Sequence, residues 1–204
     1  MITYIIIGVT AIISYLCFSR RDLFFKLSMY PSCIIENREY YRLISHVLVH
    51  GDWAHLIFNM LTLYFFGPYV ERVFIAEGFK TGAMLYLLLY VAGAIISSLY
   101  SLYRYRKDHQ YLAVGASGAV SAILFSFILI EPTQPLSLFL LPIPIPAFLF
   151  GALYLGVSFY LARKKADHIG HDAHFWGAVF GFLYTLMCFP QFLDNFVFKI
   201  QMYF

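Results

Sequence analysis

The hydrophobic positions of this chain gather in six long runs, which charged clusters and prolines separate. A helix that crosses a bilayer needs roughly 20 mostly apolar residues, and about 17–25 are tolerated. The last two runs are short by this measure. The runs cover residues 2–18, 56–74, 81–100, 112–130, 147–162 and 174–189. This pattern predicts an all-α polytopic membrane protein, a bundle of six transmembrane helices.

The segments between the runs differ in character. Residues 18–53 mix charged side chains with aromatic and apolar ones, which predicts a structured loop at the membrane interface rather than a free linker. Five prolines between residues 132 and 146 interrupt the helix there and predict an extended connector. There is no repeat with a period of 20–50 residues and no low-complexity tract, so we expect one domain over residues 1–204.

Composition strengthens the membrane interpretation. Hydrophobic residues make up 61% of the 204 residues and charged residues 12%, against roughly 45–50% and 25% in soluble proteins. Because a soluble domain could not bury so much apolar surface, an ordinary soluble enzyme and a disordered chain are both excluded. The net charge of +3, with no stripe of Lys and Arg, predicts no nucleic-acid partner. The three cysteines lack CxxC spacing, so we interpret them as packing residues.

Polar groups inside apolar runs carry the functional information, because each is costly in lipid. Three sets of such groups stand at the starts of the second, fourth and sixth runs. These three runs cross the membrane in the same direction, so their starts lie on the same side and the sets meet at one depth. The sets are His46, His50, His55 and Asn59; then Gly115, Ala116, Ser117 and Gly118; then His168, His171 and His174.

Ser117 is the candidate nucleophile of the second set. Its neighbours Gly115, Ala116 and Gly118 are small, which lets a substrate chain approach the hydroxyl. A hydroxyl near a helix N-terminus also has free backbone N–H groups beside it, which could receive a developing oxyanion. The alternative is a helix-packing motif, because pairs of small residues are common in membrane helices.

His174 is the candidate general base. It shares one helix face with Gly177 and Gly181, and these glycines let the helix press against a neighbour. If that neighbour carries Ser117, the two residues form a nucleophile and general base, a role that suits histidine because its pKa is about 6.5. The alternative is a structural histidine bonded to a backbone carbonyl.

His55 and Asn59 are spaced i, i+4 and project from one helix face. Both can donate hydrogen bonds, so together they could form an oxyanion hole. An interhelical polar contact is the alternative. Metal is disfavoured despite seven histidines, because there is no HExxH motif and the runs contain almost no carboxylate. A haem between two histidines is a further alternative, although the histidines gather at one membrane face. We therefore predict no metal and no cofactor.

Five motifs in order resemble those of the rhomboid intramembrane serine proteases, in their minimal six-helix bacterial form. The resemblance extends over the whole chain. Each motif alone is weak, whereas five in the right order on the right helices are specific. The motifs are Glu39-Tyr40-Tyr41-Arg42, His46 with His50, His55 with Asn59, Gly115-Ala116-Ser117-Gly118, and Ala173-His174 with Gly177 and Gly181.

The resemblance implies a Ser117–His174 dyad without an acidic third member, and no cofactor. It implies an oxyanion hole made by Ser117, Ala116, His55 and Asn59. The substrate would be a single-span membrane protein, cut in or next to its spanning helix, in the bilayer of a bacterial cytoplasmic membrane. The residues implied to support the structure are Glu39, Arg42, His46, His50, Gly115, Gly118, Gly177 and Gly181.

The chain departs from the family pattern at two positions. Tyr41 stands where a Trp is usual, and Ser121 stands where an aromatic residue often packs on the catalytic histidine. We therefore expect another ring, such as Phe175 or Trp176, to hold His174, or a looser hold.

Two questions stay open from the sequence. The family usually faces its site away from the cytoplasm, but eleven of the fourteen Lys and Arg fall on the active-site side, where the positive-inside rule predicts cytoplasm. The alternative function is a catalytically silent relative that binds or escorts membrane proteins. Such relatives usually lack the serine or the histidine, and this chain has both.

Overall fold

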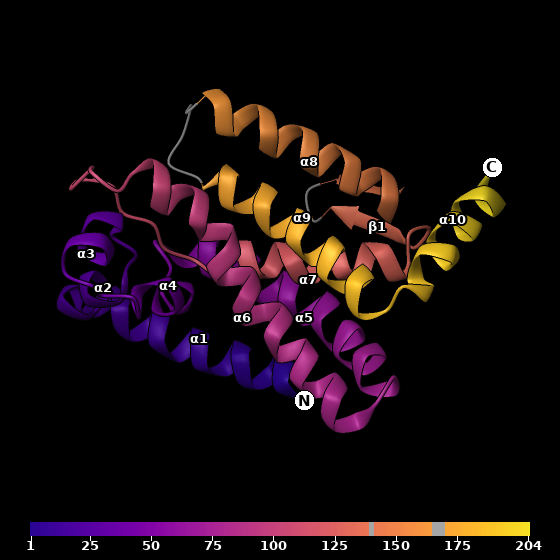
Figure 1. The fold of residues 1–204 in the computed structure, drawn as a ribbon, viewed down its shortest axis with the longest axis horizontal. Helices are drawn as coiled ribbons and strands as arrows, with labels where there is room; N and C mark the ends of the chain where they lie inside the picture. The colour runs from indigo at the N-terminus through magenta and orange to yellow at the C-terminus, as the bar shows by residue number, and fades with distance from the viewer. Residues whose placement is uncertain (139–140, 165–169) are drawn as a thin grey trace.

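The computed structural model describes residues 1–138, 141–164 and 170–204. Almost all of the secondary structure in this part of the chain is helical, and one short hairpin interrupts it (Figure 1). The elements are α1 Ile2–Ser19, α2 Arg21–Leu27, α3 Pro31–Glu36, α4 Arg42–Ser45, η1 His46–Leu48, α5 Trp53–Ala76, α6 Phe79–Arg104, α7 Ser117–Ile130, β1 Pro135–Leu138, β2 Leu141–Pro146, α8 Ala147–Lys164, α9 His171–Cys188 and α10 Gln191–Tyr203.

Each of the six apolar runs overlaps one helix, and these helices are α1, α5, α6, α7, α8 and α9. Helices α5, α7 and α9 begin at the same end of the molecule, next to α2, α3 and α4 (Figure 1). The starts of these three helices, where the described residues of the three polar sets stand, therefore lie at one end of the molecule, as expected. Helix α7 forms the centre of the bundle, between α5, α6 and α9, and every residue from Gly118 to Ile130 is buried.

The predicted start of the fourth helix, at residue 112, is wrong. Helix α7 begins at Ser117, and the apolar residues before it are not helical. Ala113 exchanges backbone hydrogen bonds with Met29, N–H to carbonyl at 2.9 and 3.0 Å, and Gly115 has a φ of +111°. The segment before Ser117 is thus bound to the first loop as an extended chain, and its apolar composition does not reveal this.

Two described helices are long and apolar enough to cross a membrane, α1 and residues 80–104 of α6. A third would be counted if α9 and α10, which are bent by 113° at their junction, formed one span. Helix α7 has 14 residues and is about 21 Å long at 1.5 Å per residue, shorter than a typical hydrocarbon core. The arrangement of six spanning helices therefore stays a prediction.

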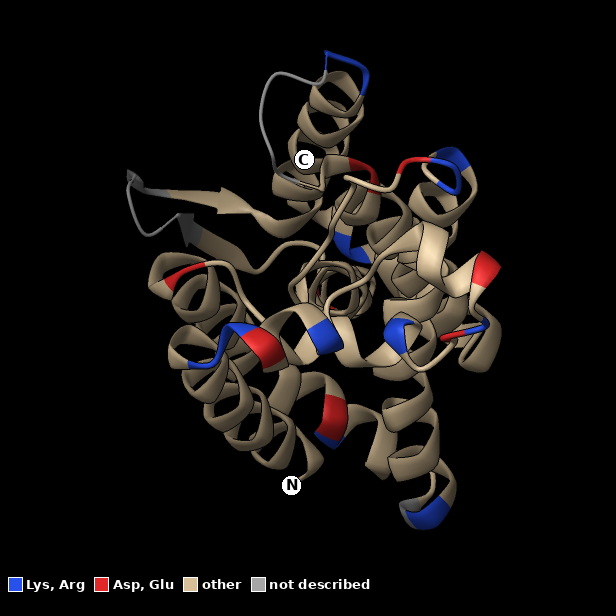
Figure 2. Cartoon of the chain, turned by 90° about the vertical axis from the view of Figure 1, so that its left-hand side faces the viewer, with Lys and Arg blue, Asp and Glu red and all other residues tan. Residues whose placement is uncertain are grey.

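The first loop is folded, as its composition predicts. Arg42 is buried there, and its Nη1 donates to the carbonyl oxygens of Phe25, Lys26 and Ser28 at 2.9, 2.7 and 2.7 Å. Its Nε donates to the carboxylate of Glu39. Acidic and basic residues lie mostly on the loops and at helix ends, and the helix bodies carry few of them (Figure 2).

The proline-rich connector is extended, as expected, and forms an antiparallel hairpin in which Pro135 pairs with Pro146. The sequence reasoning missed α10, which follows the sharp bend after α9. The ammonium of Lys199 pairs with the carboxylate of Glu131, and Asn195 Nδ2 donates to the carbonyl of Ile130 at 3.1 Å. These contacts hold α10 against the C-terminal end of α7, far from the starts of α5, α7 and α9 (Figure 1).

Candidate active site

Ser117 is the first residue of α7 and is half-buried. Just before it, Gly115 takes a positive φ, which glycine adopts without steric cost. A Cβ at Gly115 would lie 2.5 Å from both Cε1 and Nε2 of His55, well inside van der Waals contact. The glycine therefore lets the His55 ring of α5 lie directly against the segment that leads into Ser117.

Glycines also bring α9 onto α7. A Cβ on Gly177 would overlap the carbonyl oxygen of Gly118, and a Cβ on Gly181 would overlap that of Ala122. The two backbones are thus in direct contact over a full helical turn. Because Gly118 follows Ser117 and Gly177 is one turn after His174, this contact places both side chains at the same end. The close packing that these glycines predicted is thus present, and the catalytic interpretation stays a prediction.

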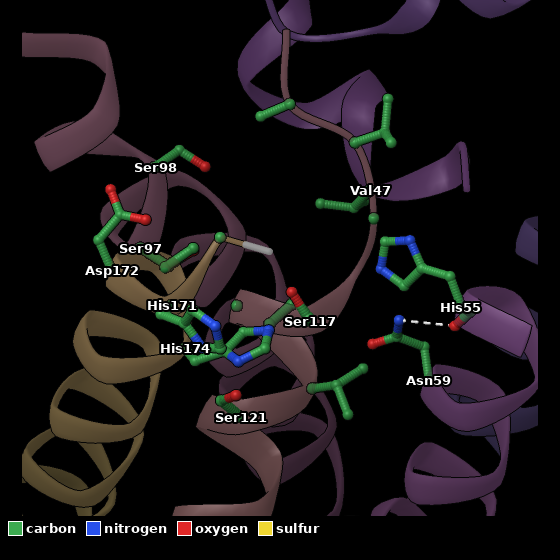
Figure 3. Close-up of a pocket in the computed structure, with 18 of the residues that line it drawn as sticks. Val47, His55, Asn59, Ser97, Ser98, Ser117, Ser121, His171, Asp172 and His174 are labelled. Carbon is green, nitrogen blue, oxygen red and sulfur yellow. Dashed lines mark hydrogen bonds between the residues drawn. The ribbon is translucent and has the colours of Figure 1, made fainter. Parts of the chain in front are cut away.

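Ser117 and His174 face each other across one pocket (Figure 3). His55 and Asn59, from α5, lie on the other side of Ser117 and line the same pocket. The structure thus brings together the four side chains that the sequence singled out on three separate helices. A carbonyl group placed above Ser117 would have the hydroxyl below it, the imidazole on one side and potential donors on the other.

The ring that packs on His174 comes from α8. Tyr154 stacks on the imidazole with ring centroids 6.1 Å apart and an interplanar angle of 26°. The expectation of Phe175 or Trp176 is not met, because Phe175 packs against Phe159 and its neighbour Trp176. No local spacing signals Tyr154, since α8 follows the hairpin and its register on α9 cannot be read from the sequence.

A second contact that the sequence reasoning missed fixes the start of α9. The hydroxyl of Ser101, near the end of α6, donates to the carboxylate of Asp172. His171, the residue before Asp172, packs edge-on against His174 with centroids 5.7 Å apart. The first turn of α9 is thus held to α6 on the side of the pocket that carries His174.

On the α5 side, the amide of Asn59 is buried and donates from Nδ2 to the carbonyl of His55 at 2.9 Å (Figure 3). An amide NH₂ has two N–H groups, so Asn59 carries a second donor besides the one bonded to His55. Asp52 caps α5 by accepting from the backbone N–H of His55 at 2.8 Å. The N–H of Ala116 points to Nε2 of His50, at 3.4 Å. The resemblance implied a place for Ala116 in the oxyanion hole, and that role stays a prediction.

His46 and His50 connect the first loop to the bundle. Nδ1 of His46 contacts the carbonyl of Arg42 at 2.8 Å, and Nε2 lies 3.2 Å from the hydroxyl of Ser98 in α6. Nδ1 of His50 lies 2.9 Å from the hydroxyl of Ser14 in α1. Burial lowers the pKa of His46 to about 4 and that of His50 to about 3, so both rings are neutral at pH 7.

Metal-binding chemistry has little support in the described part of the chain. No three His, Cys, Asp or Glu side chains in it are grouped so that they could hold a metal ion. His168, which the sequence placed with His171 and His174, lies outside the described residues.

Several known proteins are similar to this chain. Rhomboid protease GlpG of Haemophilus influenzae is 28% identical over 159 residues, which are 78% of this chain and 74% of that protein. RHOMBOID-like protein 12, mitochondrial, of Arabidopsis thaliana is 32% identical over 155 residues, 67% of this chain and 43% of that protein. Rhomboid-like protein 15 of the same plant is 30% identical over 198 residues, 90% and 46%.

The match thus spans less than half the length of the two plant proteins and about three quarters of the bacterial protease. A family model described as the Rhomboid domain matches residues 37–191, about three quarters of the chain. This stretch contains the first loop from Arg38 onward and every residue that lines the pocket around Ser117 and His174 except Met29. By this match, the chain belongs to the rhomboid family.

Proposed function

We propose that this protein is an intramembrane serine endopeptidase that uses a Ser117–His174 dyad. The observation that carries the proposal is the shared pocket of Ser117 and His174, which backbone contact between α7 and α9 creates. Neither helix could approach the other as closely if Gly177 or Gly181 carried a side chain. The arrangement supports acyl transfer, because nucleophile, base and oxyanion donors surround one point.

The proposed reaction has two steps. The Ser117 hydroxyl adds to the peptide carbonyl while His174 takes its proton. His174 then passes this proton to the leaving amine, which yields an acyl-enzyme. In the second step His174 takes a proton from water, the hydroxide adds to the ester carbonyl, and Ser117 leaves with the proton. The backbone N–H of Ser117, the second N–H of Asn59 and the His55 ring stabilise the oxyanion in both steps.

The proposed substrate is a single-span membrane protein. The pocket continues from Ser117 between α5 and α8, where apolar side chains such as Phe58, Phe65 and Phe150 line it. Such a lining suits a hydrophobic segment. The segment must unwind there, because an intact helix hides its peptide bonds. Residues 1–204 would form one membrane domain of six spanning helices, in a bacterial cytoplasmic membrane.

The test is labelling of purified, detergent-solubilised protein with a fluorophosphonate probe, which needs no knowledge of the substrate. We expect labelling of the wild type and none of Ser117→Ala or His174→Ala at equal folded fraction. Equal labelling of the wild type and Ser117→Ala would overturn the dyad.

The alternative is a catalytically silent relative that binds or escorts membrane proteins. The rhomboid-like plant proteins among the similar sequences give this alternative its weight, since their names state no protease activity. A folded wild type that neither labels nor cleaves in detergent or in lipid vesicles would favour it.

A further inference from the structure

The catalytic base of the proposed dyad is in contact with a helix that carries no other proposed catalytic group. Tyr154 of α8 stacks on the His174 ring at 6.1 Å and 26°. The Tyr154 hydroxyl lies 2.7 Å from the hydroxyl of Ser121. Ser121 is buried and stands one turn after Ser117, on the same face of α7. Tyr154 therefore bridges the helix of the nucleophile and the side chain of the base.

We propose that Tyr154 is the positioning residue of His174, held in register by Ser121, so that α8 determines the orientation of the base. This inference rests on the proposed function. The family usually supplies such a ring from the position four residues after the nucleophile, which is Ser121 here. A serine side chain is too short to pack on His174. The tyrosine reaches the same place from another helix, and the serine anchors it.

The stack acts on His174 in two ways. It restricts rotation of the imidazole, so the ring nitrogen that faces Ser117 spends more time in the productive direction. A tyrosine face also attracts a cation, which favours the imidazolium that forms when His174 takes the proton. The hydroxyl contact with Ser121 fixes the tyrosine itself, because a buried Tyr hydroxyl needs a hydrogen-bond partner.

Helix α8 lies at the outside of the bundle and packs on α9, α7 and the hairpin (Figure 1). Its outer face, with Leu153, Val157 and Tyr160, is exposed. A shift of α8 away from α7 would carry the ring away from His174 without moving Ser117. Activity of the base is therefore coupled to the position of α8.

The test compares fluorophosphonate labelling rates over pH for Tyr154→Phe and Tyr154→Leu. The phenylalanine keeps the ring and loses only the hydroxyl contact with Ser121. We therefore expect a labelling rate within about threefold of wild type, which is the size of effect that one lost hydrogen bond produces. The leucine removes the ring, so we expect a loss of roughly tenfold or more. We also expect its pH midpoint to fall by about half a unit, since the imidazolium loses the ring face. Tyr160→Leu, on the exposed face of the same helix, is the matched control and should label like wild type.

Wild-type rate and wild-type pH midpoint in a folded Tyr154→Leu protein would overturn the proposal. If Tyr154→Leu does not fold, Tyr154→Met supplies a flexible apolar side chain of similar length and is read in the same way. Failure of the proposed function has a different signature, because the wild type itself would then not label at Ser117. A second outcome would also overturn the proposal. If both Tyr154 variants lose labelling rate without a change of pH midpoint, and Tyr160→Leu loses as much, then Tyr154 has a structural role only.

Discussion

Gly177 of α9 lies against the carbonyl oxygen of Gly118 in α7 so closely that no side chain fits between them. This contact sets how far α9 can slide or rotate on α7. Gly118 adjoins Ser117, and Gly177 is three residues after His174. The distance between the proposed nucleophile and base therefore depends on the absence of a methyl group one turn away.

The first prediction concerns that contact. Gly177→Ala should lower the free energy of unfolding by about 1–3 kcal/mol, because the new Cβ forces the backbones apart. It should also reduce labelling of Ser117, since the same shift separates the dyad. Thermal unfolding in detergent and the labelling rate measure both effects. The control is Gly156→Ala in α8, where a Cβ meets nothing within 4 Å. Equal unfolding midpoints for the two variants would show that α9 accommodates the methyl group.

The second prediction concerns the proposed oxyanion hole. Asn59→Ala should lower the turnover of a membrane-anchored substrate by about 100-fold or more, the loss typical of one oxyanion donor. In the proposed mechanism the second amide N–H acts only when charge develops on the carbonyl oxygen, so the effect should fall on kcat rather than KM. Asn195→Ala, in α10 at the other end of the bundle, is the control. A loss no larger than that of the control would remove Asn59 from the mechanism.

The third prediction is a pH dependence of stability. The folded-state pKa of His46 is about 4 and that of His50 about 3, both below the value of about 6.5 expected in the unfolded chain. Between these values the unfolded state binds more protons, so stability is complete above pH 6.5 and falls as the pH decreases from there. The unfolding midpoint should therefore drop between pH 7 and pH 5, before most carboxylates titrate.

Substitution of His50 tests whether histidine protonation causes the fall of the unfolding midpoint between pH 7 and pH 5. His50→Gln should flatten the slope between pH 7 and pH 5, whatever it does to the stability at pH 7, because one of the two titrating groups is gone. An unchanged slope in His50→Gln would mean that His50 is already protonated at pH 7 or titrates equally in both states.

Much of the candidate site follows from residue spacing. Helix parity places the starts of α5, α7 and α9 together, and the glycines after His174 predict close packing on a neighbour. The local sequence pattern is sufficient to single out Ser117, His174, His55 and Asn59. Each of them stands near the start of a helix, where a polar residue contrasts with the apolar residues around it.

The rest depends on tertiary contacts that no spacing encodes. The predicted start of α7 is too early because Ala113, although apolar, is extended and pairs with Met29 of the first loop. Tyr154 is one of many tyrosines, and only the rotation of α8 directs it to His174. Asp172 gave no signal because a carboxylate in the first turn of a helix is common for reasons of charge alone.

The last prediction concerns the first loop, which carries part of the pocket wall. The guanidinium of Arg42 donates hydrogen bonds to three carbonyls and to the carboxylate of Glu39. The single ammonium group of a lysine cannot make all of these bonds, because it lacks the several N–H groups of a planar guanidinium. Arg42→Lys should cost about 2 kcal/mol or more, because buried carbonyls lose charged partners. The loop should then become sensitive to limited proteolysis between residues 20 and 52. Arg20→Lys is the control, since its pair with Asp22 is exposed and exposed pairs contribute little. Equal proteolysis rates for the two variants would show that the loop keeps its fold without the Arg42 contacts.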